Sequence, residues 1–267
     1  MDGYVHGYSA REAERLSDQA AILRRLLHHD TRFPPGSRVL EPGCGTGGQT
    51  EALLAANPDI RLTCLDIDGG QLALARARLG ARAEGVTFRQ DDLLDEPFPP
   101  ATFDHAFVCF LLEHLRHPAA ALAALQRVVR PGGSVVVVEG DHGSCRFHPE
   151  TRAGLAVWDE LVAAQRRLGG DPMVGRRLHG LLTGAGFADV RVSPRQVYAD
   201  AGDPDLRAGF VRRIIVPMVE GVRTAALAAG RLDAAAWERG IADLLATDAD
   251  GQGVFCYTFF KATARVP

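Results

Sequence analysis

The chain lacks the features that mark several protein classes. Its five cysteines form no Cys-x-x-Cys pair, which argues against a zinc site or a disulfide framework. Its formal net charge is −3, so no electrostatic attraction to nucleic acid or to an anionic membrane is expected. No apolar run approaches the ~18 residues of a transmembrane helix, and no signal peptide is visible. We therefore expect a reduced, cytoplasmic protein with no nucleic-acid or membrane partner.

Short apolar runs alternate with helical patterns in the first half of the chain. The runs cover residues 38–41, 61–66, 86–88, 103–110 and 134–139. Strands that alternate with helices predict a parallel sheet with helices on both faces. The last run holds four consecutive valines, which suits a strand that is buried on both faces. Ligand loops of such a sheet gather at the carboxyl ends of its strands.

The second half is less regular but ends on a clear strand. Its expected elements are helices at residues 151–168 and 174–185 and strands at residues 186–198 and 254–260. Between the two late strands lie two further helical patterns joined near Gly230, a longer excursion than the usual connection. We expect residues 200–250 to form a helical cap or a homodimer contact within a single domain, 1–267.

A helix is expected before the first strand. Ser9-Ala10-Arg11-Glu12 fits a capping box, and apolar residues then recur at helical spacing as far as Leu27. Tyr8 stands directly before the cap. Two interpretations stay open for residues 1–35: a hydrophobic staple at the helix start, or a lid helix over a ligand site.

A glycine-rich loop follows the first predicted strand. Four glycines fall within six residues, at Gly43, Gly45, Gly47 and Gly48. Glycine lets a ligand approach the backbone, and the N-terminus of the following helix favours a polar or anionic group. No Walker lysine accompanies the loop, so a phosphate-binding P-loop is not expected. Glu41 would repel the pyrophosphate of a dinucleotide, and it suits a cationic or amino-bearing ligand.

Acids close the next two predicted strands. Asp66 stands 25 residues after Glu41, and an acid about 20 residues beyond such a loop commonly accepts hydrogen bonds from ribose hydroxyls. Asp91 and Asp92 follow the third strand, inside the segment 88–98. We therefore expect a cofactor that carries a nucleoside.

Residues 36–140 resemble the class I S-adenosylmethionine (SAM)-dependent methyltransferases. The run Val-Leu-Glu-Pro-Gly-Cys-Gly-Thr-Gly at 39–47 is similar to motif I of this family. Asp66 matches the ribose-binding acid of the family, and residues 88–98 are similar to its adenine segment. Further matches stand, in the family's order, at Phe103-Asp104, Leu112-Glu113-His114-Leu115 and Arg130-Pro131-Gly132-Gly133.

The resemblance implies a fold and a cofactor. The fold would be a Rossmann-like, doubly wound α/β sheet of seven mostly parallel strands, the last antiparallel, with the cofactor-binding core at residues 36–145. The cofactor would be SAM and the product S-adenosylhomocysteine. Asp66 would hold the ribose, Ile67 would pack on adenine, and backbone near Cys109 would receive the methionine ammonium. The implied cofactor-binding set is Tyr8, Glu41, Gly43, Cys44, Gly45, Gly47, Gln49, Asp66, Ile67, Asp91, Asp92, Leu93 and Cys109.

The methyl acceptor is expected beside Glu139–Ser144, which we interpret as a loop after the fifth strand. His142 is the first candidate base, with Asp141 or Glu139 as its orienting partner. In the alternative interpretation, the two acids brace the loop and His142 only lines the site. His114 is a second candidate. It stands in no set of thiolates or carboxylates at metal spacing, so no metal site is expected.

We therefore expect a SAM-dependent methyltransferase that acts on a small aromatic or apolar metabolite, as in secondary metabolism. C-, N- and O-methylation stay open. The alternatives are SAM-dependent cyclisation or other diverted SAM chemistry, a non-catalytic SAM-binding protein, and a nicotinamide dehydrogenase, which Glu41 disfavours. Tyr198, Trp158, Phe210 and Met218 are expected either in the acceptor pocket or in the ordinary core.

Overall fold

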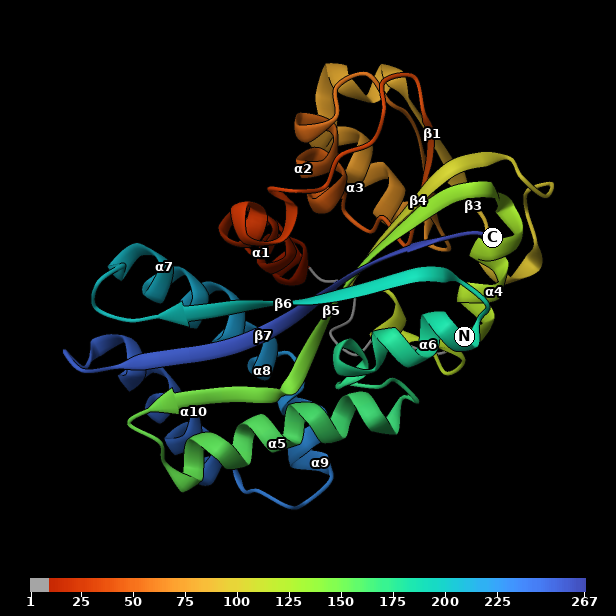
Figure 1. Cartoon of the computed structure of the whole chain (residues 1–267). Helices are drawn as coiled ribbons and strands as arrows, with labels where there is room; N and C mark the ends of the chain where they lie inside the picture. The colour runs from red at the N-terminus through yellow and green to blue at the C-terminus, as the bar shows by residue number, and fades with distance from the viewer. Residues whose placement is uncertain (1–9) are drawn as a thin grey trace.

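The computed structural model describes residues 10–267 and shows a twisted sheet flanked by helices (Figure 1). The sheet has seven strands in the order β3-β2-β1-β4-β5-β7-β6. They are β1 (Arg38–Pro42), β2 (Arg61–Asp66), β3 (Val86–Gln90), β4 (Phe103–Cys109), β5 (Val129–His148), β6 (Ala188–Ala199) and β7 (Val254–Arg265). β7 runs antiparallel to both of its neighbours, and the other strands run parallel to one another. The predicted Rossmann-like sheet, with its last strand antiparallel, is confirmed.

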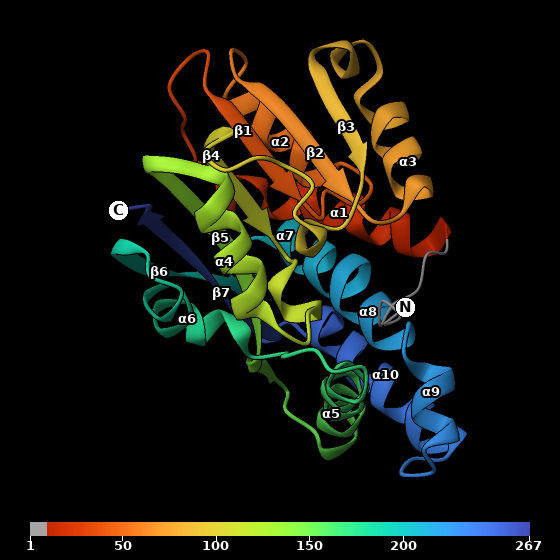
Figure 2. The ribbon, with the colours of Figure 1, turned by 90° about the vertical axis from the view of Figure 1, so that its right-hand side faces the viewer.

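Helices cover both faces of the sheet, as a doubly wound fold requires (Figures 1 and 2). One apolar cluster joins the sheet to α1, α2, α3, α5 and α10, and a second joins it to α4 and α6. The helices are α1 (Ala10–His28), α2 (Gly48–Ala56), α3 (Gly69–Leu79), α4 (Pro118–Val128), α5 (Arg152–Arg167), α6 (Leu178–Gly184), α7 (Pro204–Ala208), α8 (Val216–Glu220), α9 (Arg223–Ala228) and α10 (Ala234–Ala249). Within residues 10–267, no helix combines the length and the apolar character that a membrane span needs.

The central strands are apolar on both faces. In β4, Phe107 belongs to the first apolar cluster, while its neighbour Val108 belongs to the second. In β5, Val136 and Val137 divide in the same way. Successive side chains of a strand point to opposite faces, so each strand must supply apolar groups to both layers of helices. This double burial explains the run of four valines in the sequence.

β5 is longer than the sequence pattern predicted. The expected loop at Glu139–Ser144 is instead part of the strand, which continues to His148. The long β7 supplies pairing partners for this extension, and the pairing shifts register between Asp141 and Arg146. A register shift of this kind marks a β-bulge, which bends a strand without ending it. The residues expected on a loop are therefore part of the sheet.

The helical excursion before β7 is more broken than the two helices we predicted. It consists of α7, a π-helical segment (Gly209–Ile215), α8 and α9, followed by a turn at Gly230 and by α10. Gly230 has φ +71°, which suits a glycine turn. Trp237 of α10 is fully buried, and its Nε1 donates to Glu220 Oε1 at 3.0 Å. The end of α8 is thereby fixed to α10.

The buried centre of the sheet sets the stability of the fold. Replacing Phe107, which is fully buried, with alanine is expected to lower the free energy of unfolding by about 3–5 kcal/mol, because it leaves a cavity between sheet and helices. Urea unfolding measures this loss. The matched control is Phe88→Ala at the half-buried ring beneath the Arg76 guanidinium, which should cost less. Equal losses for the two variants would contradict the argument.

Candidate active site

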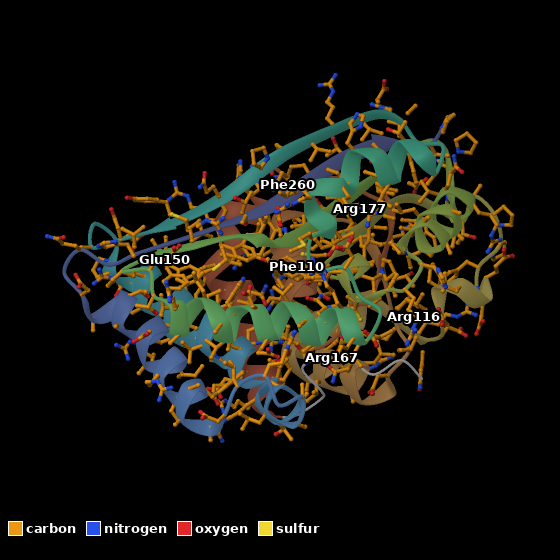
Figure 3. The ribbon with its side chains drawn as sticks, turned by 90° about the horizontal axis from the view of Figure 1, so that it is seen from below. Phe110, Arg116, Glu150, Arg167, Arg177 and Phe260 are labelled. Carbon is orange, nitrogen blue, oxygen red and sulfur yellow. The ribbon has the colours of Figure 1, made fainter. Side chains whose placement is uncertain are left out.

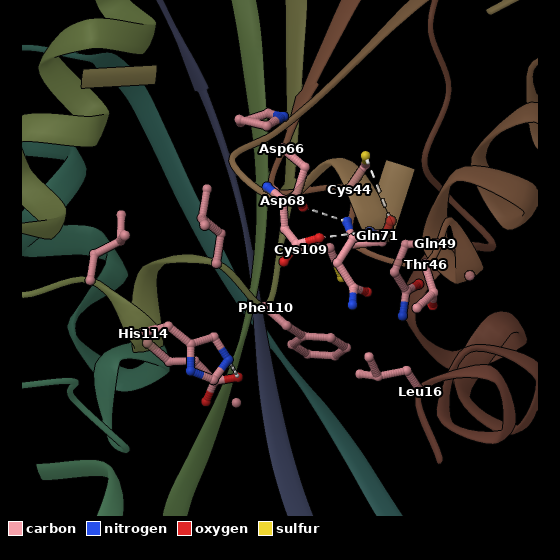
Figure 4. Close-up of a pocket in the computed structure, with 18 of the residues that line it drawn as sticks. Leu16, Cys44, Thr46, Gln49, Asp66, Asp68, Gln71, Cys109, Phe110 and His114 are labelled. Carbon is pink, nitrogen blue, oxygen red and sulfur yellow. Dashed lines mark hydrogen bonds and ion pairs between the residues drawn. The ribbon is translucent and has the colours of Figure 1, made fainter. Parts of the chain in front are cut away.

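A cavity of about 890 Å³ lies at the carboxyl ends of the parallel strands (Figure 4). The glycine loop, the ends of β2 and β4 and residues 90–94 line one part of it. α1, the π-helical segment, α8 and β7 line the other part. Small-molecule sites commonly span ~300–1,000 Å³, so this cavity stands near the upper end and has room for a cofactor beside a small acceptor.

The glycine loop uses its glycines in two ways. A Cβ at Gly47 would lie 2.9 Å from the Cβ of Ala75, so Gly47 lets α3 pack against the start of α2. A Cβ at Gly43 would meet the Leu111 side chain at 2.8 Å. Gly45 has φ +52° and lines the cavity, and no heavy atom lies within 4 Å of a Cβ built on it. Gly45 is therefore where a ligand can approach the backbone, whereas Gly47 does not line the cavity.

The acid that closes β2 is bound to the same loop. Asp66 accepts hydrogen bonds from the N–H groups of Gly45 (2.8 Å) and Asp68 (3.0 Å), and burial raises its pKa above the usual value. The next residue, Ile67, is 58% exposed, and Leu94 is 44% exposed. Both line the cavity. Apolar side chains left open in a cavity fit a flat ring such as adenine, which would cover them.

The segment after β3 brings three expected contacts to the cavity. Asp91, Asp92 and Leu93 all line it. The Asp91 carboxylate accepts from Arg89 Nε, and the Asp92 carboxylate accepts from the N–H of Leu94 at 2.8 Å. Both acids therefore stay candidates for the adenine amine.

α1 lies over the glycine loop. Arg78 links the two, since its Nε donates to Thr46 O (2.9 Å) and its Nη1 donates to Ser17 Oγ (2.7 Å). The Gln49 side chain lines the cavity, and its Oε1 lies 2.7 Å from His28 Nε2 on α1. These contacts hold the helix as one wall of the cavity.

The remaining expected cofactor contacts differ in position. Cys44 and Cys109 line the cavity, at the glycine loop and at the end of β4. Glu41 is only 2% exposed and does not line the cavity, and burial raises its pKa to about 7. The family resemblance implies that Glu41 acts near the amino end of SAM, directly or through water. The position of Glu41 does not support a direct contact, and a role through water stays a prediction. Tyr8 lies outside the described residues.

The residue after β4 has an unusual backbone conformation that no sequence pattern indicated. Phe110 has φ +57°, which is uncommon for a residue with a side chain. Its N–H donates to Val138 O at 2.9 Å, and its ring centroid lies 5.5 Å from that of Phe259. Phe110 lines the cavity, and its ring appears between His114 and Leu16 in Figure 4. Strained backbone of this kind clusters at ligand sites, where the surrounding structure holds it.

His142 faces the cavity and pairs with Tyr257. Its Nδ1 lies 2.6 Å from Tyr257 Oη, and its carbonyl accepts from Trp158 Nε1 at 2.9 Å. Burial lowers the pKa of His142 and raises that of Tyr257, so both side chains are neutral near pH 7. Sequence reasoning missed Tyr257, although a signal exists. It is a hydroxyl between Phe255 and Phe259 on the apolar face of β7, and a buried hydroxyl needs a partner.

The two acids expected to orient His142 bind other groups. The Asp141 carboxylate accepts from Arg176 Nη2 (2.7 Å) and Nε (2.8 Å). Glu139 is fully buried and accepts from the three N–H groups of residues 111–113, at 3.0, 2.7 and 3.4 Å. Neither acid lines the cavity. The expected pairing with His142 is therefore corrected: the carboxylate of Asp141 is bound by Arg176, and that of Glu139 is bound by the turn at residues 111–113.

His114 and Glu113 both line the cavity. His114 Nε2 lies 3.6 Å from Glu113 Oε1, and burial lowers the pKa of His114 to about 4. These two residues and the His142–Tyr257 pair bring four side chains with acid–base chemistry to one cavity.

The aromatic and methionine side chains expected near the acceptor divide into two groups. Phe210 and Met218 line the cavity from the π-helical segment and α8. Tyr198 is 58% exposed on β6, outside the cavity, and Trp158 is buried without lining it. Side chains fill the space between α5 and the sheet (Figure 3). The cap therefore contributes apolar walls, and β6 does not.

Acidic side chains outnumber basic ones around the cavity. The acids that line it are Glu12, Asp66, Asp68, Asp91, Asp92 and Glu113, and the arginines are Arg15 and Arg116. A lining of this sign favours a cationic ligand and disfavours a phosphate. SAM carries a sulfonium and an ammonium, so the residues present fit SAM better than a dinucleotide. No group of His, Cys, Asp and Glu within residues 10–267 is arranged to hold a metal ion.

Comparison with known proteins agrees with this site. A family model described as a methyltransferase domain matches residues 40–137. An O-methyltransferase of Pyrenophora dematioidea is 30% identical over 197 residues, which cover 70% of this chain and 69% of that protein. The chain belongs to the class I SAM-dependent methyltransferases. An O-methyltransferase of Penicillium expansum is 33% identical to this methyltransferase over 149 residues, and the match spans about half of each protein, 53% and 54%.

Solved structures share the fold of the methyltransferase. A Haemonchus contortus phosphoethanolamine N-methyltransferase, in complex with phosphomonomethylethanolamine and S-adenosylhomocysteine, aligns with a TM-score of 0.57 and 17% identity. The alignment covers 94% of this chain and 52% of that one. The (4+2)-cyclase SpnF aligns with a TM-score of 0.57 and 22% identity, over 95% of this chain and 81% of that one. The cofactor of the methyltransferase is SAM, as in its family.

The open side of Gly45 yields a direct test of the cofactor site. Gly45→Ala is expected to weaken SAM binding by roughly tenfold or more, because the added Cβ projects into the cavity. The matched control is Gly36→Ala. Gly36 also has a positive φ (+78°) and open space around it, but it lies outside the cavity lining. Both variants place a side chain at a positive φ, so equal SAM affinities by isothermal titration would contradict the assignment.

Burial of Glu41 yields a prediction for stability against pH. Its pKa is raised from 4.5 to about 7, so the folded protein holds this proton more tightly than the unfolded chain does. The stability gained in this way is fully present below pH 4.5 and is lost as the pH rises through 7. Without cofactor, Glu41→Gln should therefore gain up to about 3 kcal/mol of unfolding free energy relative to the wild type at pH 8.5, and little at pH 5. Urea unfolding at both pH values measures the difference. A pH-independent effect of Glu41→Gln would refute the explanation.

Proposed function

We propose that the methyltransferase transfers the methyl group of SAM to a hydroxyl of a small, apolar or aromatic acceptor. The observation that carries the proposal is the buried His142–Tyr257 pair on the wall of the cavity. Apolar side chains that suit a ring line the same cavity: Phe110, Phe210, Ile214, Ile215, Met218 and Phe259. The choice of oxygen over carbon or nitrogen is supported by relatives that are named O-methyltransferases.

The cofactor half of the proposal follows the residues that line the cavity. Asp66 would hold the ribose hydroxyls, Ile67 would cover adenine, and Asp91 or Asp92 would accept from the adenine amine. Backbone at Cys109 would receive the methionine ammonium. The acidic lining supports this placement because SAM carries two cationic groups, the sulfonium and the ammonium, and only one carboxylate.

His142 would act as the proton acceptor. When bound, SAM supplies a methyl group that is activated for displacement by its sulfonium. Burial keeps the imidazole of His142 neutral near pH 7, so it has a free nitrogen for a proton. In the tautomer whose Nδ1–H donates its hydrogen bond to Tyr257 Oη, Nε2 carries no hydrogen. Nε2 would then take the proton of the substrate hydroxyl.

The other walls would align the acceptor and exclude water. α1 and the π-helical segment line the cavity from two sides, which supports the expected roles of residues 1–35 as a lid and residues 200–250 as a cap. Alignment of nucleophile, methyl carbon and sulfur is the main contribution a protein makes to such a displacement. A homodimer contact of the cap and a cytoplasmic location stay predictions.

The proposal is tested by incubating the protein with SAM and a panel of phenols, hydroxylated polycycles, indoles and enolisable ketones. Formation of S-adenosylhomocysteine together with an O-methylated product supports it. Methylation at carbon or nitrogen would overturn the choice of oxygen. SAM binding without S-adenosylhomocysteine would favour diverted SAM chemistry or a non-catalytic binder.

The role of His142 leads to a specific kinetic prediction. His142→Asn is expected to lower kcat by about 10²–10⁴-fold, the usual contribution of a general base, while the SAM affinity stays the same. The matched control is His148→Asn, at an exposed histidine on the end of the same strand. Unchanged kcat in His142→Asn would show that the histidine only lines the site.

A further inference from the structure

Glu113 is a carboxylate that faces the His142–Tyr257 pair. A Cβ built on Gly140 would lie 2.6 Å from Tyr257 Oη and 3.8 Å from Glu113 Oε2. The hydroxyl and the carboxylate therefore flank the same point of β5, where the chain has no side chain. Tyr257 Oη is in turn 2.6 Å from His142 Nδ1. A side chain at position 140 would displace the hydroxyl of this group.

Surrounding elements fix Glu113 in this position. Its N–H donates to Glu139 Oε2 (3.4 Å), and its carbonyl accepts from the N–H of Asp171 (2.9 Å) and from Gln165 Nε2 (3.2 Å). Its carboxylate accepts from Gln165 Nε2 at 3.4 Å. The residue is 7% exposed and lines the cavity. Burying a carboxylate is costly, so the fold holds this charge beside the acceptor space at some expense of stability.

The charges around His142 divide by sign. The titratable or charged groups near it are Glu113 and His114 from the turn after β4, Arg15 from α1, Tyr257 from β7 and, on its own strand, Asp141. Burial lowers the pKa of His142, His114 and Arg15 act in the same direction, and Glu113 opposes them. Asp141 is bound to Arg176 and points away from the cavity. Glu113 is therefore the acid that favours a charged imidazole.

We propose that Glu113 stabilises the imidazolium that forms when His142 takes the proton of the acceptor hydroxyl. The inference rests on the proposed function, and Glu113 acts through His142. The hydroxyl proton moves to Nε2, and the electron pair of its bond stays on oxygen. An oxygen lone pair forms the bond to the methyl carbon, and the carbon–sulfur pair stays on sulfur. The positive charge that leaves the sulfonium thus reappears on His142, in a buried site where Glu113 supplies the opposite charge.

Glu113→Gln tests this role, because glutamine keeps the size of the side chain and can still accept from Gln165. In the SAM-bound protein, ¹⁵N NMR of labelled histidine is expected to show the pKa of His142 lowered by about one unit, since an opposite charge is lost. The acidic limb of kcat/KM against pH should move down by the same amount. The plateau kcat should fall roughly tenfold, because a weaker base accepts the proton less readily.

Two controls separate this role from a structural one. Glu84→Gln, at an exposed glutamate of residues 80–85, should leave the His142 pKa, the pH profile and kcat unchanged. In Glu113→Gln, SAM affinity should stay close to the wild type, and the melting temperature should not fall, because the variant no longer buries a charge. An unchanged His142 pKa and pH profile in Glu113→Gln would overturn the proposal. If Glu113→Gln lowers the pKa of His142 but His142→Asn keeps full activity, the proposed function fails and the catalytic role of Glu113 fails with it. The NMR measurement needs no methyl acceptor, so it distinguishes failure of the Glu113 proposal from failure of the proposed function.

Discussion

The antiparallel pairing of β5 with β7 is the constraint on which the catalytic end of the cavity depends. It extends β5 beyond the point where its parallel neighbour β4 stops, and it places His142 beside Tyr257, 115 residues further along the chain. The register shift between Asp141 and Arg146 bends the extended strand without releasing it from the sheet. His142 stands at this bulge, where its N–H donates to Pro172 O at 2.8 Å and its side chain contacts Tyr257. A proton acceptor held by such contacts would have little freedom to move, which suits a reaction that depends on alignment.

The same strand also shapes the other wall of the site. Glu139 reaches across to the N–H groups of residues 111–113 and so fixes the turn that carries Glu113 and His114. Burial raises the pKa of Glu139, whereas three converging N–H donors favour its charged form. The acid therefore holds the backbone of the turn and is not a group that handles protons for the reaction. Glu113, His114 and Tyr257 therefore owe their positions to contacts made by β5.

The sequence allowed the cofactor half to be predicted and left the acceptor half largely open. The glycine loop, Asp66 and the acids at 91–92 are local patterns in which strand, turn and helix follow one another within a few residues. Local propensities decide such segments, so their spacing indicated a cofactor that carries a nucleoside, and the resemblance to the family indicated SAM and the adenine contact. The direction of Asp141 and the partner of His142 depend on pairing with a strand that lies more than a hundred residues away. No local pattern contains that register, so a strand extension was interpreted as a loop.

This division has a chemical consequence for the family. In the proposed scheme, backbone and acids of contiguous motifs bind the donor, so these motifs can be kept while the rest of the chain changes. The proposed acceptor space is lined by β7, the turn after β4, α1 and the π-helical segment, and each of these is distant in sequence from the others. Changes in the helical excursion can reshape the apolar walls at Phe210 and Met218 without disturbing the glycine loop. Acceptor specificity can therefore diverge while the donor site stays the same, which is why shared motifs identify the methyl donor but not the molecule that receives the methyl group.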